Sequence, residues 1–365
     1  MSELDPKLKQ RIRQDVQSMH AYAIQDSAGM VKLDAMENPF GLPPELQAQL
    51  GQRLGALALN RYPDGRVNDL RAALAAYAGM PDDYDIMLGN GSDELISLLA
   101  LACDVPGASI LAPVPGFVMY AMSAQLQGLA FHGVPLTADL ELDVVAMLGA
   151  IARHKPSITY LAYPNNPTAN LWNEGAIAKI IAAVGEQGGL VVMDEAYQPF
   201  ASRSWLENIR ANPAAHSHVL LMRTLSKFGL AGVRLGYMMG PKALVAEVDK
   251  VRPPYNISVL NYECALFALE HVEVFAAQAL AIKAQRAIIF EALSVLPGVK
   301  AWNSQANMIL VRVPDAQKTF EGMKARRILV KNVSKMHPLL ANCLRLTVGT
   351  ADENRQMLAA LKESL

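Results

Sequence analysis

The stretch Leu190-Val-Val-Met-Asp-Glu-Ala-Tyr197 decides the fold class, because a short, wholly apolar run ends abruptly on carboxylates. Such a run is typical of a strand that is covered on both faces, as in the parallel sheets of α/β proteins. Helix-length segments such as residues 94–102 and 174–186 separate further runs of this kind. The expected strands are residues 85–88, 109–112, 129–134, 158–162, 190–193, 219–222 and 233–239. We therefore predict an α/β fold with a mostly parallel, seven-stranded sheet between helices.

The pattern changes after Pro253-Pro254, where helical periodicity extends to about residue 296 and strand-like runs follow at 308–313 and 344–348. A chain of 365 residues is also longer than one ordinary domain. We expect a large domain at residues 41–252, a smaller α+β domain at 253–365, and an N-terminal arm at 1–40 that its pattern alone assigns to neither.

Composition excludes several classes of protein. Hydrophobic residues make up 52% of the chain and charged residues 18%, which is typical of a compact enzyme-sized fold. The net charge of −1 provides no basic excess for nucleic acid. The first ten residues have no apolar core for a secretory signal, and prolines and glycines interrupt the uncharged residues 105–124. With three widely spaced cysteines, we expect a cytoplasmic protein that binds neither nucleic acid nor a membrane.

Polar residues directly follow several of the apolar runs, where the ligand crevice of an open α/β sheet lies. In Gly89-Asn-Gly-Ser-Asp-Glu94 a strand turns into a helix, and the backbone amides of Gly91, Ser92 and Asp93 could hold a phosphate. The alternative is an ordinary capped helix start. A dinucleotide fingerprint would need a glycine where Glu94 stands.

Lys227 and Asp194 are the candidate reactive groups. An amine condenses with an aldehyde only when it is deprotonated, which burial near a cation such as Arg234 favours. Ser226 and Arg234 could also bind a phosphate, although a lysine in such a loop, taken alone, is more often a solvated residue. Asp194 ends an apolar strand and needs a cation, either a protonated pyridine nitrogen or an arginine in a buried pair. Asn166, in a proline-rich loop, could donate to a ring oxygen or merely form a turn.

The order of these motifs resembles that in the fold-type I pyridoxal-phosphate aminotransferases, and most closely the histidinol-phosphate aminotransferases. The likeness extends from Leu33-Asp-Ala-Met-Glu-Asn-Pro39 to Leu344-Arg-Leu-Thr-Val-Gly-Thr350. It implies pyridoxal 5′-phosphate (PLP) as cofactor, and a small amino donor and 2-oxoglutarate as substrates. It further implies a homodimer, and an arm that packs with the small domain and the active site.

The resemblance also implies a role for each motif. Lys227 would bind the cofactor aldehyde and move the substrate proton, and Asp194 would pair with the pyridine nitrogen. Asn166 and Tyr197 would contact the ring oxygen, and Phe117 would stack on the ring. The phosphate would be bound by Gly91, Ser92, Asp93, Thr224, Ser226 and Arg234, with Tyr62 reaching it from the partner subunit. The substrate would be held by Tyr22, Glu37, Asn38, Asn166, Lys331 and Arg345.

Three positions depart from the family pattern. Phe117 stands where many relatives have tyrosine, which keeps the stacking but loses a hydroxyl. Ala169 replaces the glycine of Asn-Pro-Thr-Gly, so the conformation of that loop is open. Lys331 replaces an arginine that often assists phosphate recognition, and it supplies a point charge without bidentate geometry.

Alternative functions stay open on the sequence alone. A phosphothreonine decarboxylase would use the same residues, and an aromatic amino acid aminotransferase could bind a carboxylate through Arg345 and Lys331. A nicotinamide-dependent dehydrogenase would fit the parallel sheet but lacks the glycine fingerprint. We expect no metal site, because His216 and His218 have no third ligand nearby in the sequence.

Overall fold

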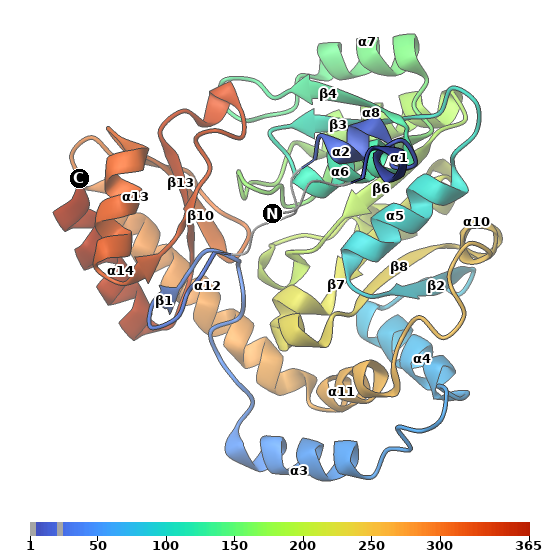
Figure 1. Cartoon of the computed structure of the whole chain (residues 1–365), viewed down its shortest axis with the longest axis horizontal. Helices are drawn as coiled ribbons and strands as arrows, with labels where there is room; N and C mark the ends of the chain where they lie inside the picture. The colour runs from blue at the N-terminus through green and yellow to red at the C-terminus, as the bar shows by residue number, and fades with distance from the viewer. Residues whose placement is uncertain (1–4, 20–24) are drawn as a thin grey trace.

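The structure, a computed structural model, describes residues 5–19 and 25–365 (Figure 1). Its largest sheet has seven strands in the order β2-β8-β7-β6-β5-β3-β4. Strands β7, β6, β5, β3 and β4 are parallel, whereas β8 runs antiparallel to both of its neighbours. The prediction of a mostly parallel sheet is confirmed. The strands are β2 (Tyr84–Gly89), β3 (Ser109–Val114), β4 (Ala130–Pro135), β5 (Ile158–Ala162), β6 (Leu190–Asp194), β7 (Val219–Thr224) and β8 (Gly236–Pro241).

The strand predicted at residues 233–239 begins later than expected, and that part of the prediction is wrong. Arg234 has a φ of 57°, in the left-handed region, so an extended strand cannot pass through it. Strand β8 therefore starts at Gly236. The preceding turn directs the Arg234 side chain toward Ser226, which becomes important at the site.

Alternate residues of the strands pack on opposite faces of the sheet, as expected for strands that are covered on both sides. Met87 and Leu220 pack in the apolar layer beneath α5, α6 and α10 on one face, whereas Ile86 and Leu221 pack in the apolar layer beneath α4, α7, α8, α9 and α11 on the other. These helices are α4 (Arg66–Ala78), α5 (Ser92–Ala102), α6 (Val118–Gln127), α7 (Val144–His154), α8 (Glu174–Glu186), α9 (Leu206–Ala211), α10 (Lys242–Asp249) and α11 (Val259–Glu270).

A second core lies beside the large sheet, on the left in Figure 1. It contains an antiparallel sheet in the order β12-β13-β10-β9, with α12, α13 and α14 packed against it. The domain boundary between residues 252 and 253 stays a prediction. The elements are β9 (Lys300–Ala301), β10 (Met308–Arg312), β12 (Lys331–Asn332), β13 (Cys343–Thr347), α12 (Val272–Ser294), α13 (Ala316–Ala325) and α14 (Ala351–Ser364).

The N-terminal segment contacts both regions. Strand β1 (Val31–Lys32) pairs in parallel with β11 (Ile328–Leu329), so the residues that follow it are held beside the second core. Further upstream, the Nη1 of Arg13 donates a hydrogen bond of 2.5 Å to the carbonyl oxygen of Leu126 in α6. The remaining helices are α1 (Pro6–Lys9), α2 (Gln14–Gln17) and α3 (Pro44–Gly55).

Helices α11 and α12 follow one another as a bent, largely apolar pair. No single helix in residues 5–19 and 25–365 is long and apolar enough to cross a bilayer. By length and composition alone, α11 and α12 together would be long and apolar enough, with a bend of 78° between them.

Candidate active site

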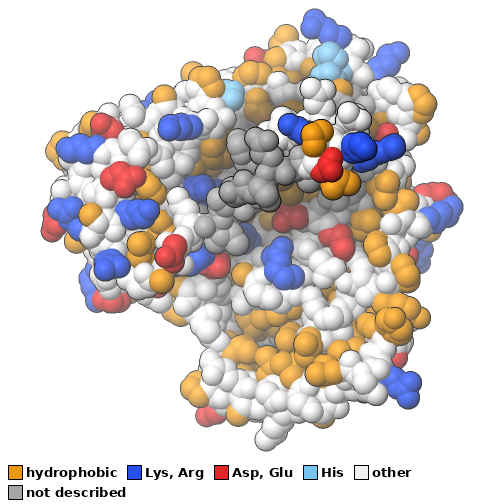
Figure 2. All heavy atoms as spheres, viewed as in Figure 1, with side chains coloured by type: hydrophobic (Ala, Val, Ile, Leu, Met, Phe, Trp, Pro, Cys, Tyr) orange, Lys and Arg blue, Asp and Glu red, His pale blue; other side chains and the backbone are white. Residues whose placement is uncertain are grey.

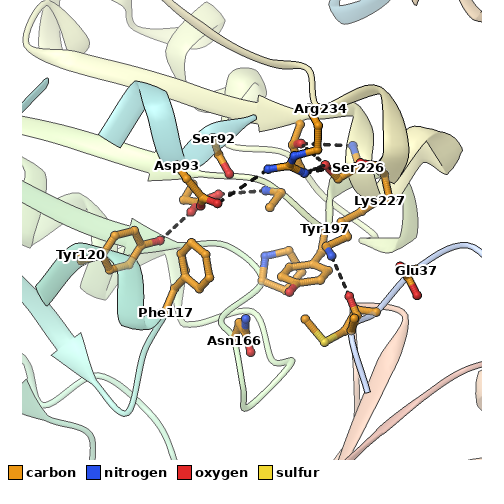
Figure 3. A pocket seen from close by; sticks show the side chains of 18 of the residues that line it. Glu37, Ser92, Asp93, Phe117, Tyr120, Asn166, Tyr197, Ser226, Lys227 and Arg234 are labelled. Carbon is orange, nitrogen blue, oxygen red and sulfur yellow. Dashed lines mark hydrogen bonds and ion pairs between the residues drawn. The ribbon is translucent and has the colours of Figure 1, made fainter. Parts of the chain in front are cut away.

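A cavity of about 330 Å³ lies at the carboxyl ends of β5, β6 and β7, where the fold predicts a ligand site. Figure 3 shows Phe117 and Tyr120 on one side of it, Lys227 and Glu37 on the opposite side, and Arg234 between them. The cavity brings together most of the predicted site residues. Those that line it are Glu37, Ser92, Asp93, Phe117, Asn166, Asp194, Tyr197, Thr224, Ser226, Lys227 and Arg234.

One end of the cavity is built as an anion site. Helix α5 begins at Ser92, and its first backbone amides have no partner within the helix. Gly91 precedes it with a φ of 80°, and a Cβ there would lie 2.7 Å from the Nη2 of Arg234. The left-handed backbone therefore favours glycine at this position, and a larger side chain would also displace the guanidinium.

Hydroxyl groups complete the anion site. The Nη1 of Arg234 donates to the Oγ of Ser226 at 3.3 Å, and Thr224 donates to the same oxygen at 3.0 Å. The Nη2 of Arg234 lies 3.8 Å from the Oδ2 of Asp93, in a partly exposed ion pair. Helix amides, a hydroxyl and a guanidinium around one space are the donors that bind a phosphate.

Lys227 lies in a short π-helical turn, Ser226–Leu230, shortly after β7, and it is not a solvated loop residue. Its Nζ donates a hydrogen bond of 2.9 Å to the carbonyl oxygen of Ala35, which follows β1. Burial lowers the pKa of Lys227 to about 8, and the charge of Arg345 lowers it further, more than that of Arg234 does. About a tenth of the amine is thus unprotonated and nucleophilic at pH 7, far more than in an ordinary lysine.

Asp194 ends β6 with its carboxylate in the cavity and 4% of the residue exposed. Its Oδ2 accepts a hydrogen bond of 2.6 Å from the hydroxyl of Tyr120, and its Oδ1 accepts one of 3.0 Å from the amide of Ala196. Burial raises the pKa of Asp194 to about 6, against the effect of these two donors. No arginine or lysine within the described ranges forms a salt bridge with it.

A buried pair with an arginine, one of the two partners considered for Asp194, is formed instead by the next residue, Glu195. Glu195 is 1% exposed and accepts hydrogen bonds of 3.0 and 2.9 Å from the Nε and Nη2 of Arg223. The amide of Trp205 and the hydroxyl of Ser204 also donate to its carboxylate. Of two adjacent carboxylates, Glu195 is thus neutralised by the protein, and Asp194 is left facing the cavity.

Asn166 lines the cavity, and Arg345, which is 7% exposed, lies behind it and does not line the cavity. The Nη1 of Arg345 donates to the Oδ1 of Asn166 at 2.8 Å, and its Nη2 donates to the carbonyl oxygen of Asp34 at 2.8 Å. This leaves the amide hydrogens of Asn166 on the cavity side as donors. The adjacent Ala169, in place of glycine, adopts a φ of 61° in a fully buried position.

Several predicted residues do not line the cavity. The Nδ2 of Asn38 donates to the side chain of Gln278 at 2.9 Å, and Lys331 pairs with Arg345 only in strand register. Tyr62 is 78% exposed, away from the cavity, and Tyr22 lies outside the described residues.

The histidines considered as metal ligands have structural contacts. One ring nitrogen of His216 and one of His218 lie 2.7 and 2.9 Å from backbone carbonyl oxygens. Across residues 5–19 and 25–365, no three His, Cys, Asp or Glu side chains are grouped in a way that could hold a metal ion.

Comparison with known proteins identifies the family. The sequence profile of the family described as "Aminotransferase class I and II" matches residues 28–361. The histidinol-phosphate aminotransferase of Polaromonas naphthalenivorans (strain CJ2) is 79% identical over 364 residues, covering 100% of this chain and 99% of that protein. The chain belongs to the histidinol-phosphate aminotransferase family. The dehydrogenase alternative is therefore wrong.

Solved structures agree on the fold of this aminotransferase. A histidinol-phosphate aminotransferase from Sinorhizobium meliloti, in complex with pyridoxal-5′-phosphate, matches with a TM-score of 0.84 at 24% identity, covering 97% of each chain. An L-threonine-O-3-phosphate decarboxylase from Porphyromonas gingivalis matches with a TM-score of 0.75 at 21% identity, covering 91% of this chain and 98% of that one. The fold is that of the fold-type I transferases, and by itself it does not separate transamination from decarboxylation.

Sequence reasoning missed two contributors to the aminotransferase site. Tyr120, which binds Asp194, lies one helical turn after Phe117, and that spacing places the two rings on one side of α6. The backbone carbonyl of Ala35, which accepts from Lys227, has no signal in the sequence, because any residue provides a carbonyl.

Proposed function

We propose that this aminotransferase transfers the amino group of L-histidinol phosphate to 2-oxoglutarate, giving imidazole acetol phosphate and L-glutamate. The choice of donor rests on one observation, the 79% identity to a histidinol-phosphate aminotransferase over essentially the whole chain. The reaction class rests on the geometry, in which an amine of lowered pKa and a buried carboxylate face one cavity beside an anion site.

The cofactor of the aminotransferase is PLP, and the residues present fit it. The anion site of Ser226, Arg234 and the α5 amides suits its phosphate, and Asp194 suits a protonated pyridine nitrogen. Lys227 suits its aldehyde, and Phe117 offers an aromatic face. When bound, PLP supplies an electron sink for the carbanion that forms at the substrate carbon.

Lys227 carries the proton in this mechanism. Because burial lowers the pKa of its Nζ to about 8, the amine could accept a proton from the substrate carbon and deliver it to the cofactor carbon on the other side of the transferred nitrogen. The carbonyl of Ala35 holds the Nζ at 2.9 Å in the resting site. Asp194, kept anionic, holds the ring nitrogen protonated.

Arg345 binds the acidic end of each substrate in this proposal. Its guanidinium is fixed between Asn166 and the carbonyl of Asp34, with both hydrogen bonds at 2.8 Å, so it is oriented before a substrate arrives. A planar guanidinium receives either a phosphate or a carboxylate, which suits an enzyme that alternates between two acidic substrates. Lys331, in register with Arg345 on β12, would add a second positive charge.

We also propose that the enzyme is a cytoplasmic homodimer. Tyr62 stacks on Tyr255 at 4.7 Å between ring centroids, and both rings are mostly exposed, as is Leu59. Figure 2 shows hydrophobic side chains gathered in the lower part of the view, where α3 and α11 lie in Figure 1. A second copy covering this face would place Tyr62 at the partner's phosphate site, as the family resemblance implies.

The proposed function is tested with a panel of amino donors and 2-oxoglutarate. Histidinol phosphate should give the highest kcat/KM, with glutamate as product and no carbon dioxide. Phenylalanine and phosphothreonine serve as competing donors, and gas release from phosphothreonine would favour a decarboxylase instead. Borohydride reduction followed by peptide mapping should label Lys227 in the wild-type protein and leave a Lys227→Arg variant unlabelled. A preference for phenylalanine would overturn the substrate while keeping the reaction class.

A further inference from the structure

The hydroxyl of Tyr120 contacts a residue of the active site, the carboxylate of Asp194. Tyr120 lies in the first turn of α6, 2% exposed, and its hydroxyl donates a hydrogen bond of 2.6 Å to the Oδ2 of Asp194 on β6. The Oδ1 of Asp194 accepts from the amide of Ala196. Each oxygen of the carboxylate is therefore held by a different element, and the plane of the carboxylate is fixed.

The ring of Tyr120 is itself locked on two sides. It lies parallel to the ring of Tyr160, with 4.3 Å between centroids and an interplanar angle of 7°. It meets the ring of Phe117 edge to face, with 5.6 Å between centroids and an angle of 87°. A rigid ring determines where its hydroxyl points, and the same ring supports the aromatic face that Phe117 presents to the cavity.

We propose that Tyr120 is a positioning residue, whose hydroxyl orients the Asp194 carboxylate toward the cofactor ring and whose ring supports Phe117 against the same cofactor. This inference rests on the proposed function, because it concerns how PLP is held. Tyr120 takes no part in proton transfer. Its hydroxyl affects cofactor binding only through the ring nitrogen that Asp194 faces.

The charges around Asp194 make this hydrogen bond consequential. The ionisable groups near it are Asp93 on α5, Tyr120 on α6, Tyr160 on β5, and Glu195 and Tyr197 after β6. Burial raises the pKa of each of these tyrosines, so they stay neutral, whereas the carboxylates of Asp93 and Glu195 disfavour a third negative charge. The Tyr120 hydroxyl opposes that effect by lowering the pKa of Asp194.

The chain contains a matched control for removal of this hydroxyl. Tyr160 is buried in the same stack, and its own hydroxyl has no hydrogen-bond partner among the described residues. Tyr120→Phe and Tyr160→Phe therefore remove the same atom from adjacent rings, and only the first touches Asp194. A difference between the two variants reports the hydrogen bond rather than the packing.

The test measures PLP affinity of the cofactor-free proteins by absorbance titration between pH 5 and pH 9. A second titration uses a PLP analogue in which carbon replaces the ring nitrogen. Loss of a hydrogen bond to a charged group predicts roughly 10- to 100-fold weaker PLP binding by Tyr120→Phe, with wild-type affinity in Tyr160→Phe. The pH below which affinity falls should be higher in Tyr120→Phe, because its Asp194 protonates more easily. The analogue should bind the variants and the wild type equally.

The possible results separate this inference from the proposed function. Equal PLP affinity and equal pH dependence in the two variants would overturn the role of Tyr120 alone, and so would an equal loss for PLP and its analogue. A wild-type protein that does not bind PLP would overturn the proposed function first. If Tyr120→Phe does not fold, 3-fluorotyrosine at position 120 retains the ring with a stronger donor. It should move the loss of affinity to lower pH, and an unchanged pH profile would again refute the inference.

Discussion

Replacing Asp194 with asparagine should stabilise the cofactor-free protein at pH 8. The same replacement should nearly abolish the activity of the PLP-bound enzyme. The carboxylate is 4% exposed, and it has hydrogen-bond donors but no salt bridge to the described residues. Burial raises its pKa from 3.8 to about 6. Because the folded state binds this proton more tightly than the unfolded state does, the free energy of unfolding falls as pH rises from about 4 to 6.

The size of the effect follows from the same pKa. Each tenfold change in proton affinity is worth about 1.4 kcal/mol, so the ionised carboxylate costs the folded state roughly 3 kcal/mol above pH 6. Asparagine carries no such charge, so the cost is absent in Asp194→Asn at every pH. In the PLP-bound enzyme the ionised carboxylate should stabilise the folded state, because it then faces a cationic ring nitrogen, and Asp194→Asn should be the less stable protein. Turnover should fall by several orders of magnitude.

Urea unfolding of the cofactor-free wild type and of Asp194→Asn would measure this effect at pH 4.5 and pH 8. Protein concentration and ionic strength must be matched, since association also contributes to stability. The stability of the variant relative to the wild type should increase between these pH values by about 2 kcal/mol. A constant difference across the range, or a variant that is less stable only at pH 8, would refute the reasoning.

Two further variants and one rate measurement test other parts of the site. Glu195→Gln breaks a fully buried pair with Arg223 and should cost about 3–5 kcal/mol in urea unfolding; a cost below about 1 kcal/mol would contradict that role. The rate at which the cofactor-free enzyme captures PLP should rise with pH and level off above about pH 8, following Lys227; a rise that continues past pH 10 would show an ordinary lysine. Arg345→Lys loses the bidentate fork and should lower kcat/KM for both acidic substrates by roughly 10- to 100-fold, and unchanged kinetics would place the substrate elsewhere.

The sequence predicted the elements that local pattern controls. Short apolar runs predicted the strands of the large sheet, because strands buried on both faces tolerate few polar residues. The carboxyl ends of those strands meet at one edge of the sheet, so Asp194 and Lys227 could be assigned to one site before any contact was known. The start of β8 could not be predicted, because nothing in the local sequence requires the left-handed conformation of Arg234.

Contacts between distant segments were not predictable from pattern. Tyr120 binds Asp194 across 74 positions of sequence, and Lys227 binds Ala35 across 192. Such pairs depend on how helices are laid over the sheet, which is determined by packing of the whole core. The left-handed Ala169 is similar, since a buried alanine with a φ of 61° persists only where surrounding contacts fix it.

The two carboxylates at the end of β6 show how the fold divides stability from function. Asp194 is the last residue of β6 and Glu195 follows it, and the two side chains enter different surroundings. Glu195 faces Arg223 on the neighbouring strand β7 and is neutralised there. Asp194 faces the cavity with hydroxyl and amide donors, which hold a carboxylate in place without neutralising it. A one-residue shift in the register of β6 would turn the Asp194 side chain to the opposite face of the sheet and leave the cavity without this carboxylate. The register of this strand is therefore a catalytic requirement as well as a structural one.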